Sequence, residues 1–222
     1  QKSRFIEGAV QNNIDKKEAS KIFDLVDKFA GYGFNKSHAA AYALIAFQTA
    51  YLKTYFKEDF IAATMSTELT NTSKLREFVE ELKRLNVEII RPTLNKCFAE
   101  FKALDGKIYY GLGAIKNVGY EAISNIVKER EKNGKFTSFN NFIKRVDPKD
   151  VNKLQLEGLT KAGVFDEFDK DRNKIFTSIP KIIQKIKNMN DDKNTNQSSL
   201  FENNENTENN FEFLPSTPWK QK

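Results

Sequence analysis

The sequence contains a single cysteine, Cys97, a single histidine, His38, and only five prolines among 222 residues. One cysteine cannot form an internal disulfide or a cysteine-based metal site, which is typical of a protein of the reducing cytoplasm. No run of 18 apolar residues is present and no charged-then-apolar leader opens the sequence, so we expect neither membrane insertion nor secretion. The acidic residues are scattered over predicted helix surfaces and no Asp-x-Asp pattern lies on a predicted strand, so we predict no metal ligands.

The composition is otherwise that of a folded protein. Hydrophobic residues make up 39% of the sequence and charged residues 30%, which suits one or two compact domains. The 19 Phe and seven Tyr supply enough large apolar side chains for most of the length to fold. The first residue is Gln1 and not Met. The next residues, Arg4, Phe5 and Ile6, have helical character, as if the sequence began within a helix. We therefore expect the chain to be a fragment of a longer protein.

Charge is distributed unevenly along the chain. Residues 1–95 hold 14 Lys and Arg against 12 Asp and Glu, residues 96–187 hold 19 against 12, and residues 188–222 hold 3 against 6. The net charge of +7 on the middle segment is typical of a nucleic-acid-binding surface. The alternative is a lysine-rich solvated surface in a protein encoded by AT-rich codons, which the abundant Lys, Asn and Ile also favour.

The first part of the chain is predicted to be entirely helical. Apolar residues at helical spacing predict helices over about residues 16–30, 39–57, 59–69 and 75–85. Ser37 is the expected N-cap of the second helix, and Asn71 belongs to the cap signal that precedes the fourth. We therefore expect residues 1–95 to form an all-α first domain.

The pattern changes near residue 87. Val87 to Ile90 reads as a short strand, and Asp105-Gly106 between apolar runs predicts a β-hairpin. Helices are predicted over about residues 120–131, 138–146, 149–161 and 170–188, the last kinked or interrupted by Pro180. The nine Asn and few apolar residues of 188–210 predict a disordered tether. The expected fold is mainly α, with domains at 1–95 and 96–187 and a disordered tail at 188–222.

The densest cluster of chemically capable residues lies at the predicted start of the 39–57 helix. Glycines, aromatic residues, Lys36 and His38 gather there, where free backbone N–H groups and the positive end of the helix dipole favour phosphate. Lys36 adds a charge and His38 a hydrogen-bond donor that can be protonated. The alternative is a turn between two helices, broken by glycine, with a capping Ser and a packed His.

Two segments match helix-hairpin-helix hairpins, in which an apolar residue between two small residues holds a tight turn. Exposed amides of such a turn bind a DNA phosphate without reading sequence. The first candidate is residues 115–119, where Asn117 stands at the usual first glycine and tolerates a positive φ better than most residues. The second is residues 156–165, with its turn at Ala162-Gly163. The candidate DNA-binding residues are Lys116, Asn117, Val118, Gly119, Lys128, Arg130, Lys161 and Gly163.

A short apolar motif lies inside the Asn-rich tail. Leu200 and Phe201 follow Gln197 in a segment with no local core for them to join. An isolated Leu-Phe pair in a polar tether is a candidate peptide ligand, although a chance match in a low-complexity tail is the alternative.

Together these residues closely resemble the alpha subunit of bacterial DNA polymerase III, a C-family replicative polymerase. Residues 29–44, FAGYGFNKSHAAAYAL, look like the family's fingers motif, and residues 110–116, 163–166, 197–201 and 218–219 follow in the family's order. The resemblance covers about residues 1–201. It implies a fingers domain, then a tandem helix-hairpin-helix domain, then an internal clamp-binding motif. Asn117 departs from the family's usual glycine, and the chain stops before the family's OB-fold domain.

The resemblance also implies roles and partners. The nucleotide-binding residues would be Gly33, Asn35, Lys36, Ser37, His38 and Tyr42, and the clamp-binding residues Gln197, Leu200 and Phe201. The parent enzyme would transfer a deoxynucleotide to a primer 3′ end with Mg²⁺, on primer-template DNA, in company with the sliding clamp and other holoenzyme subunits. The family's metal-binding aspartates lie in a palm domain upstream of this segment, so we expect the chain alone to be inactive.

Other functions remain open on the sequence alone. A stand-alone helix-hairpin-helix DNA-binding module is the main alternative, although a pure DNA grip does not need the Lys36 and His38 cluster. A scaffold for the clamp alone would not explain 187 folded residues. A mutagenic paralogue of the polymerase is a further alternative, against which the motif at Gln197 to Phe201 argues mildly.

Overall fold

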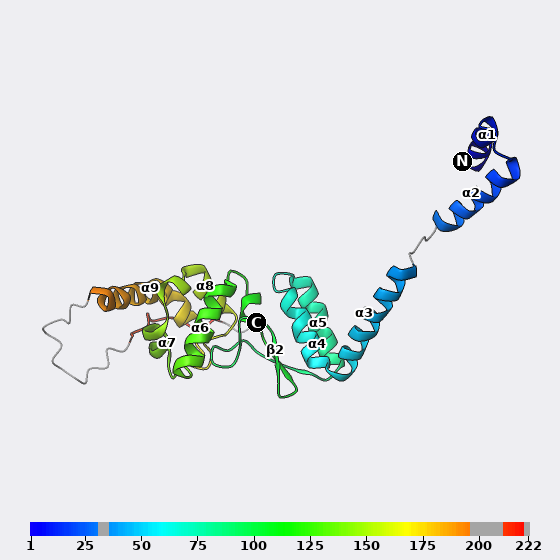
Figure 1. Ribbon diagram of the computed structural model, residues 1–222. Coiled ribbons are helices and arrows are strands. Elements are labelled where there is room, and N and C mark those ends of the chain that lie inside the picture. Colours follow the sequence, from blue (N-terminus) through cyan, green and yellow to red (C-terminus); the bar gives the residue numbers. More distant parts are fainter. Residues whose placement is uncertain (31–35, 196–210, 220–222) are drawn as a thin grey trace, which may run out of the picture. The chain divides into compact units, whose positions relative to one another are not determined.

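A computed structural model describes residues 1–30, 36–195 and 211–219 of the chain. The described residues are mainly helical with one small three-stranded sheet, which confirms the mainly α fold class (Figure 1). The chain separates into two compact units, residues 1–54 and 55–222. This division precedes the domain boundary expected at residue 95, because the two helices after residue 55 pack against the sheet of the second unit.

The first unit holds helices α1 (Lys2–Gln11), α2 (Lys16–Ala30) and most of α3 (Lys36–Tyr55). Helix α2 is the predicted helix 16–30, and the Asp15 carboxylate accepts hydrogen bonds from the amides of Lys17 and Glu18 at its start. Helix α3 begins at Lys36, three residues before the expected start. Ser37 therefore lies in the first turn of α3 and is not its cap.

The second unit opens with helices α4 (Lys57–Thr67) and α5 (Thr72–Arg84). The Asn71 side chain accepts a hydrogen bond from the Lys74 amide at 3.2 Å, which confirms the predicted cap of α5. Both helices share a hydrophobic cluster with the sheet, centred on Ile61, Met65 and Ile108.

The sheet contains β1 (Glu88–Ile90), β2 (Lys102–Leu104) and β3 (Lys107–Tyr109), in the order β1-β3-β2. Strand β3 pairs parallel to β1 and antiparallel to β2. Asp105 and Gly106 join β2 to β3 with φ values of 53° and 70°, the two positive angles of a type I′ turn. The hairpin predicted from the Asp-Gly pair is thus confirmed.

The remaining elements are η1 (Leu112–Ala114), α6 (Tyr120–Asn133), α7 (Phe139–Arg145), η2 (Pro148–Asp150), α8 (Lys153–Lys161) and α9 (Arg172–Thr195). The helix expected over residues 149–161 is divided, because the Asn152 side chain caps α8 through the Gln155 amide at 2.9 Å. Helix α9 continues through Pro180 without interruption and ends seven residues later than expected.

Phenylalanine rings form the centre of the core that these last helices share. Phe139 and Phe142 lie 5.1 Å and 5.3 Å from Phe165 between ring centroids, and Phe136 lies 5.5 Å from Phe142. Tilted and edge-on contacts of this kind add to the free energy of area burial. The cluster holds α7 against the segment that connects α8 to α9.

The prediction of a disordered tail from residue 188 onward is wrong at both ends. Helix α9 extends to Thr195, with Met189 packed against the core. Residues 211–219, here called the return segment, lie against α7 and α9, where Phe211 is buried and its amide donates to the Asn140 side chain at 2.8 Å. The Ser178 hydroxyl accepts from the Leu214 amide at 2.8 Å. Aromatic residues in the return segment join a core that local sequence composition does not reveal.

The phenylalanine core yields a stability prediction. Phe142 is 0% exposed, so Phe142→Ala should lower the free energy of unfolding by about 3–5 kcal/mol, through lost burial and the cavity left behind. Leu154 is 57% exposed on α8, and Leu154→Ala should change it by less than about 0.5 kcal/mol. Urea unfolding of both variants measures the difference, and equal effects would contradict the packing described.

Candidate nucleic-acid interface

The first hairpin, residues 115–119, is a tight turn directly before α6. The Val118 amide donates to the Ile115 carbonyl at 3.1 Å, and Val118 is buried beneath the turn. Asn117 adopts a φ of 65°, in the region that favours glycine. The expectation that Asn117 preserves the turn in place of glycine is confirmed.

Helix α6 begins at this turn, and its first amides have no hydrogen-bond acceptor among the described residues. Its N-cap is Gly119, which has no side chain to accept from the first-turn amides, and the first amide of the helix ladder belongs to Ile123. Gly119 and the neighbouring Lys116 are exposed. The start of α6 therefore offers N–H groups, the positive end of a helix dipole and one cation, the combination that binds phosphate.

Helix α8 packs closely against the hairpin at Gly158. A Cβ atom placed on Gly158 would lie 2.6 Å from the Lys116 carbonyl oxygen and 3.2 Å from the Val118 side chain. Only glycine allows this approach of two backbones. The position of the hairpin therefore follows from the position of α8, whose Leu156 and Leu159 are buried in the core.

The second candidate hairpin ends α8 in a different way. Gly163 has a φ of 80°, and the amides of Gly163 and Val164 donate to the carbonyls of Thr160 and Leu159. These two bonds form the Schellman motif that closes a helix C-terminus. The Arg172 guanidinium, bonded to Asp166 and to the Lys161 carbonyl, covers Gly163. The amides of Gly163 and Val164 are thus engaged within the protein.

Arg130 lies inside the domain and not on its surface. It is 6% exposed, and its guanidinium donates to the carbonyls of Leu94 and Cys97, both at 2.6 Å, while lying 5.2 Å from the Phe98 ring centroid. Burial lowers the pKa of Arg130, which nevertheless stays protonated at neutral pH. The guanidinium holds the 94–97 loop to α6 and has no exposed face for a phosphate, so Arg130 lies outside the proposed interface.

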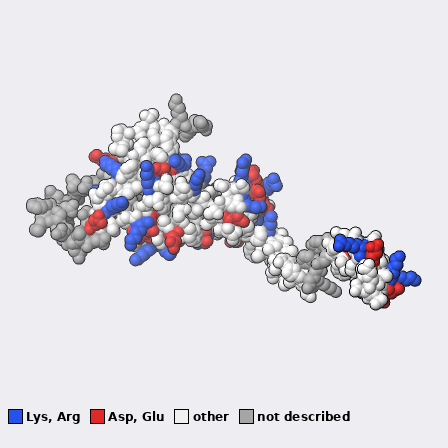
Figure 2. Space-filling view, turned by 90° about the horizontal axis from the view of Figure 1, so that it is seen from above, with Lys and Arg blue, Asp and Glu red and all other residues white. Residues whose placement is uncertain are grey.

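The candidate lysines differ in their surroundings. Lys116 and Lys128 are exposed, whereas the Lys161 ammonium lies 3.7 Å from Glu157 and 4.8 Å from the Phe176 ring centroid. On the face shown in Figure 2, lysines and arginines alternate with acidic residues and form no single-sign field. On this face the positive charge is therefore not gathered into one patch.

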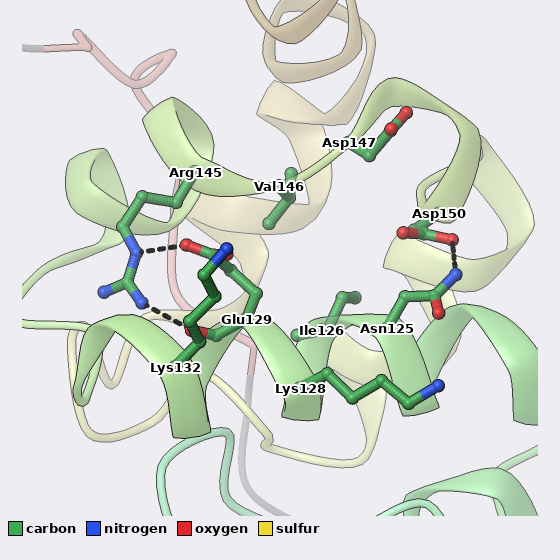
Figure 3. Close-up of a pocket in the computed structure, with 9 residues that line it drawn as sticks. All are labelled: Asn125, Ile126, Lys128, Glu129, Lys132, Arg145, Val146, Asp147 and Asp150. Atoms are coloured by element: carbon green, nitrogen blue, oxygen red, sulfur yellow. Dashed lines mark hydrogen bonds and ion pairs between the residues drawn. The ribbon is translucent and has the colours of Figure 1, made fainter.

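Two adjoining grooves run along α6. One, of about 670 Å³, adjoins the first hairpin and is lined by residues of α6, η2 and the start of α8. The other, of about 440 Å³, continues past Lys128 to Arg145, and Figure 3 shows its side chains. Asn125 and Asp150 line both grooves and hydrogen-bond across them at 2.9 Å. In Figure 3, Arg145 reaches Glu129 at 3.0 Å, which closes one wall.

The other candidate sites are only partly described. Gly33 and Asn35 lie outside the described residues, as do Gln197, Leu200 and Phe201. Lys36, Ser37, His38 and Tyr42 lie in the first two turns of α3, where the His38 and Tyr42 rings are 4.5 Å apart. Tyr42 is 54% exposed. The structure therefore brings His38 and Tyr42 together on one helix face.

Metal and membrane features are absent from the part of the chain that the structure describes. Within residues 1–30, 36–195 and 211–219, no three His, Cys, Asp or Glu side chains are grouped so that they could hold a metal ion. No helix in these ranges combines the length and apolarity needed to span a bilayer. Cys97 is buried and burial raises the pKa of its thiol, so it serves as a packing group.

The hairpin belongs to a helix-hairpin-helix region, which its contact with Gly158 and the surrounding helices define. Residues 86–175 match the helix-hairpin-helix motif family. Residues 86–175 include both hairpins proposed from the sequence. The match agrees with the geometry of the first hairpin. The amides of the second hairpin are already bonded within the protein.

Similarity extends well beyond this motif. The chain is 46% identical over 89% of its length to the DNA polymerase III subunit alpha of Borreliella burgdorferi, 44% over 90% to that of Campylobacter jejuni, and 43% over 90% to that of Caulobacter vibrioides. The chain belongs to the family of bacterial DNA polymerase III alpha subunits. It spans 17 to 18% of the length of these relatives.

The buried guanidinium yields a prediction that separates a packing role from a DNA contact. Arg130→Met leaves the Leu94 and Cys97 carbonyls without their donor, so it should lower the free energy of unfolding by roughly 2–4 kcal/mol. Lys128→Met, on the same helix but exposed, should change stability by less than about 0.5 kcal/mol. Urea unfolding measures both. An Arg130→Met variant as stable as the wild type would mean that the guanidinium is not the support of the 94–97 loop.

Proposed function

We propose that this chain is the part of a replicative DNA polymerase that grips duplex DNA, contributes contacts to the incoming nucleotide and attaches the enzyme to its sliding clamp. The whole enzyme would be a DNA-directed DNA polymerase that extends a primer on a template, working with other holoenzyme subunits. The observation that carries the proposal is the first hairpin, with free amides and Lys116 at the start of α6. Identity of 43 to 46% to named alpha subunits supports the enzyme context.

The DNA grip would be independent of sequence. Amides at a hairpin and helix start reach phosphate oxygens and not base edges, so they position the duplex without reading it. Lys116 and Lys128 add exposed charge, and Gly119 leaves room for a phosphate to approach the backbone. A processive polymerase needs a grip of this kind, because it must hold every sequence equally.

The nucleotide contacts would come from the start of α3. Lys36, Ser37 and His38 occupy its first turn, where the helix dipole favours the triphosphate, and Tyr42 lies one turn further along. Gly33 and Asn35 complete the proposed set. The match of residues 29–44 to the fingers motif of the family supports this assignment.

Mg²⁺ would be held elsewhere in the enzyme. Phosphoryl transfer needs metal ions held by carboxylates, and the described residues do not fit that requirement, since they contain no suitable group of ligands. We propose that the chain is inactive by itself.

Clamp attachment would use Gln197, Leu200 and Phe201. The apolar pair would enter a cleft on the clamp while the Gln197 amide hydrogen-bonds at the rim. Tethering to DNA-bound polymerase raises the effective concentration of the motif, so a modest affinity suffices for processive synthesis. A stand-alone DNA-binding module would need neither this motif nor the identity outside residues 86–175.

Duplex binding by the chain should depend on the hairpin. If about three or four phosphates are neutralised, the slope of log affinity against log salt concentration should be roughly −3 to −4. Gly119→Val should weaken binding to all duplexes alike, because added methyl groups obstruct the amides, while a Cβ at Gly119 meets no atom closer than 4.0 Å and the fold survives. Fluorescence anisotropy with two unrelated duplexes measures both effects.

The matched control is Gly8→Val, since Gly8 is an open position on α1 in the other unit. It should bind duplex as the wild type does. Salt-independent binding, clear preference for one duplex, or equal losses in both variants would contradict a backbone grip at the hairpin.

A peptide of residues 190–210 should bind the sliding clamp with a Kd of about 1 µM, near −8 kcal/mol. Replacing Leu200 and Phe201 by Ala should abolish binding, because the apolar anchors are lost, whereas replacing Ser198 and Ser199 should have little effect. Calorimetric titration with purified clamp measures this. Absence of binding by the unmodified peptide at high micromolar concentration would refute the clamp assignment.

A further inference from the structure

The groove beside the first hairpin has a second wall that no proposed DNA contact uses. Lys149, Asn152 and Gln155, from η2 and the start of α8, line the same 670 Å³ groove as Asn117 and Gly119. The hairpin amides form one wall and the N-terminus of α8 belongs to the other. Two helix N-termini therefore border one groove.

Gln155 is the unusual member of this wall. It is 3% exposed, and its Nε2 group has no hydrogen-bond partner among the described residues. Its Oε1 atom lies 3.5 Å from the Asn152 Nδ2 donor, and its backbone amide is bonded to Asn152 Oδ1. A buried amide donor without an acceptor costs about 1–3 kcal/mol, so its retention at the edge of a groove points to an acceptor that arrives with a ligand.

The chemistry of the groove selects the ligand. Lys149 is exposed, and its ammonium has no carboxylate within ion-pair distance among the described residues. Glu121 and Asp150 also line the groove, so together with Lys149 its charged side chains sum to −1. Asp150 is engaged by Asn125, and Glu121 is an exposed residue in the first turn of α6. An anion must therefore be held mainly by oriented N–H donors, as a phosphate is at helix N-termini.

We infer that Gln155 and Lys149 complete a two-walled cradle for one backbone phosphate of DNA, with the amides of residues 119–122 as the opposite wall. The inference rests on the proposed DNA grip and adds the residues that enclose the phosphate. Gln155 Nε2 donates to a phosphate oxygen, and Lys149 supplies the only cationic side chain among the described residues that line this groove. Gly158 on α8 fixes the distance between the walls, since it packs against the Lys116 carbonyl.

The test is duplex binding by the full 222-residue chain over a range of salt concentrations. Gln155→Leu should weaken binding roughly 10-fold with the wild-type salt slope, because a neutral donor to a charged oxygen is lost. Lys149→Ala should weaken binding and reduce the salt slope by about one, because one phosphate charge is no longer neutralised. Lys153→Ala, an exposed lysine of α8 that does not line the groove, should bind as the wild type does.

A second measurement does not depend on the folding of any variant. In the wild-type chain, the side-chain amide resonances of Gln155 should shift on addition of duplex. Those of Gln184, which is bonded to Asn188 on α9, should stay in place. Inorganic phosphate added instead of duplex tests whether the phosphate group alone is sufficient.

The outcomes separate this inference from the proposed function. If Gly119→Val loses binding but Lys149→Ala and Gln155→Leu keep wild-type affinity and slope, the second wall is refuted and the hairpin grip stands. If the Gln155 resonances stay unchanged at saturating duplex, the inference is likewise refuted. If the wild-type chain binds no duplex, the proposed grip itself fails.

Discussion

The close approach of α8 to the first hairpin is the contact on which the rest of the interface depends. At Gly158 a Cβ atom would lie 2.6 Å from the Lys116 carbonyl oxygen, so any other residue would push the hairpin away from α8. Leu156 and Leu159 anchor the same helix in the phenylalanine-rich core. The direction of the hairpin amides is therefore set by the packing of the whole domain, and a flexible loop could not present them so reproducibly.

The basic residues of segment 96–187 differ in their partners. The three arginines of this segment, Arg130, Arg145 and Arg172, donate hydrogen bonds to carbonyl oxygens or carboxylates of the same domain. Their planar guanidinium groups donate in several directions and suit this bracing role. Exposed lysines such as Lys116, Lys128 and Lys149 keep their charge at the surface. A count of positive charge thus overstates the charge that is presented to DNA.

The return segment contributes aromatic side chains to the core of the second unit. Phe213 packs 5.3 Å from Phe139, and Trp219 lies 5.4 Å from Phe176, so residues far along the chain close the same core. The Lys174 and Lys181 ammonium groups lie over the Phe213 and Phe211 rings, which adds cation–π attraction to the apolar contacts. The core therefore includes Phe211 and Phe213, which follow α9 in the chain.

The sequence by itself determined the turns and caps that depend only on neighbouring residues. Asp105 and Gly106 both adopt the positive φ angles of a type I′ turn. Asn71 caps α5, and Asn117 adopts the positive φ that the first hairpin requires. The resemblance of residues 29–44 and of the hairpin segments also identified the family, since the residues of each motif are close together in the chain. Tertiary structure decided the rest. Arg130 has the same charge as a surface arginine, and only the two carbonyls facing it show that it is buried. Gln155 and Lys149 line the same groove as the hairpin because α8 packs against the hairpin at Gly158 and η2 packs against α6, and no spacing in the sequence records these contacts.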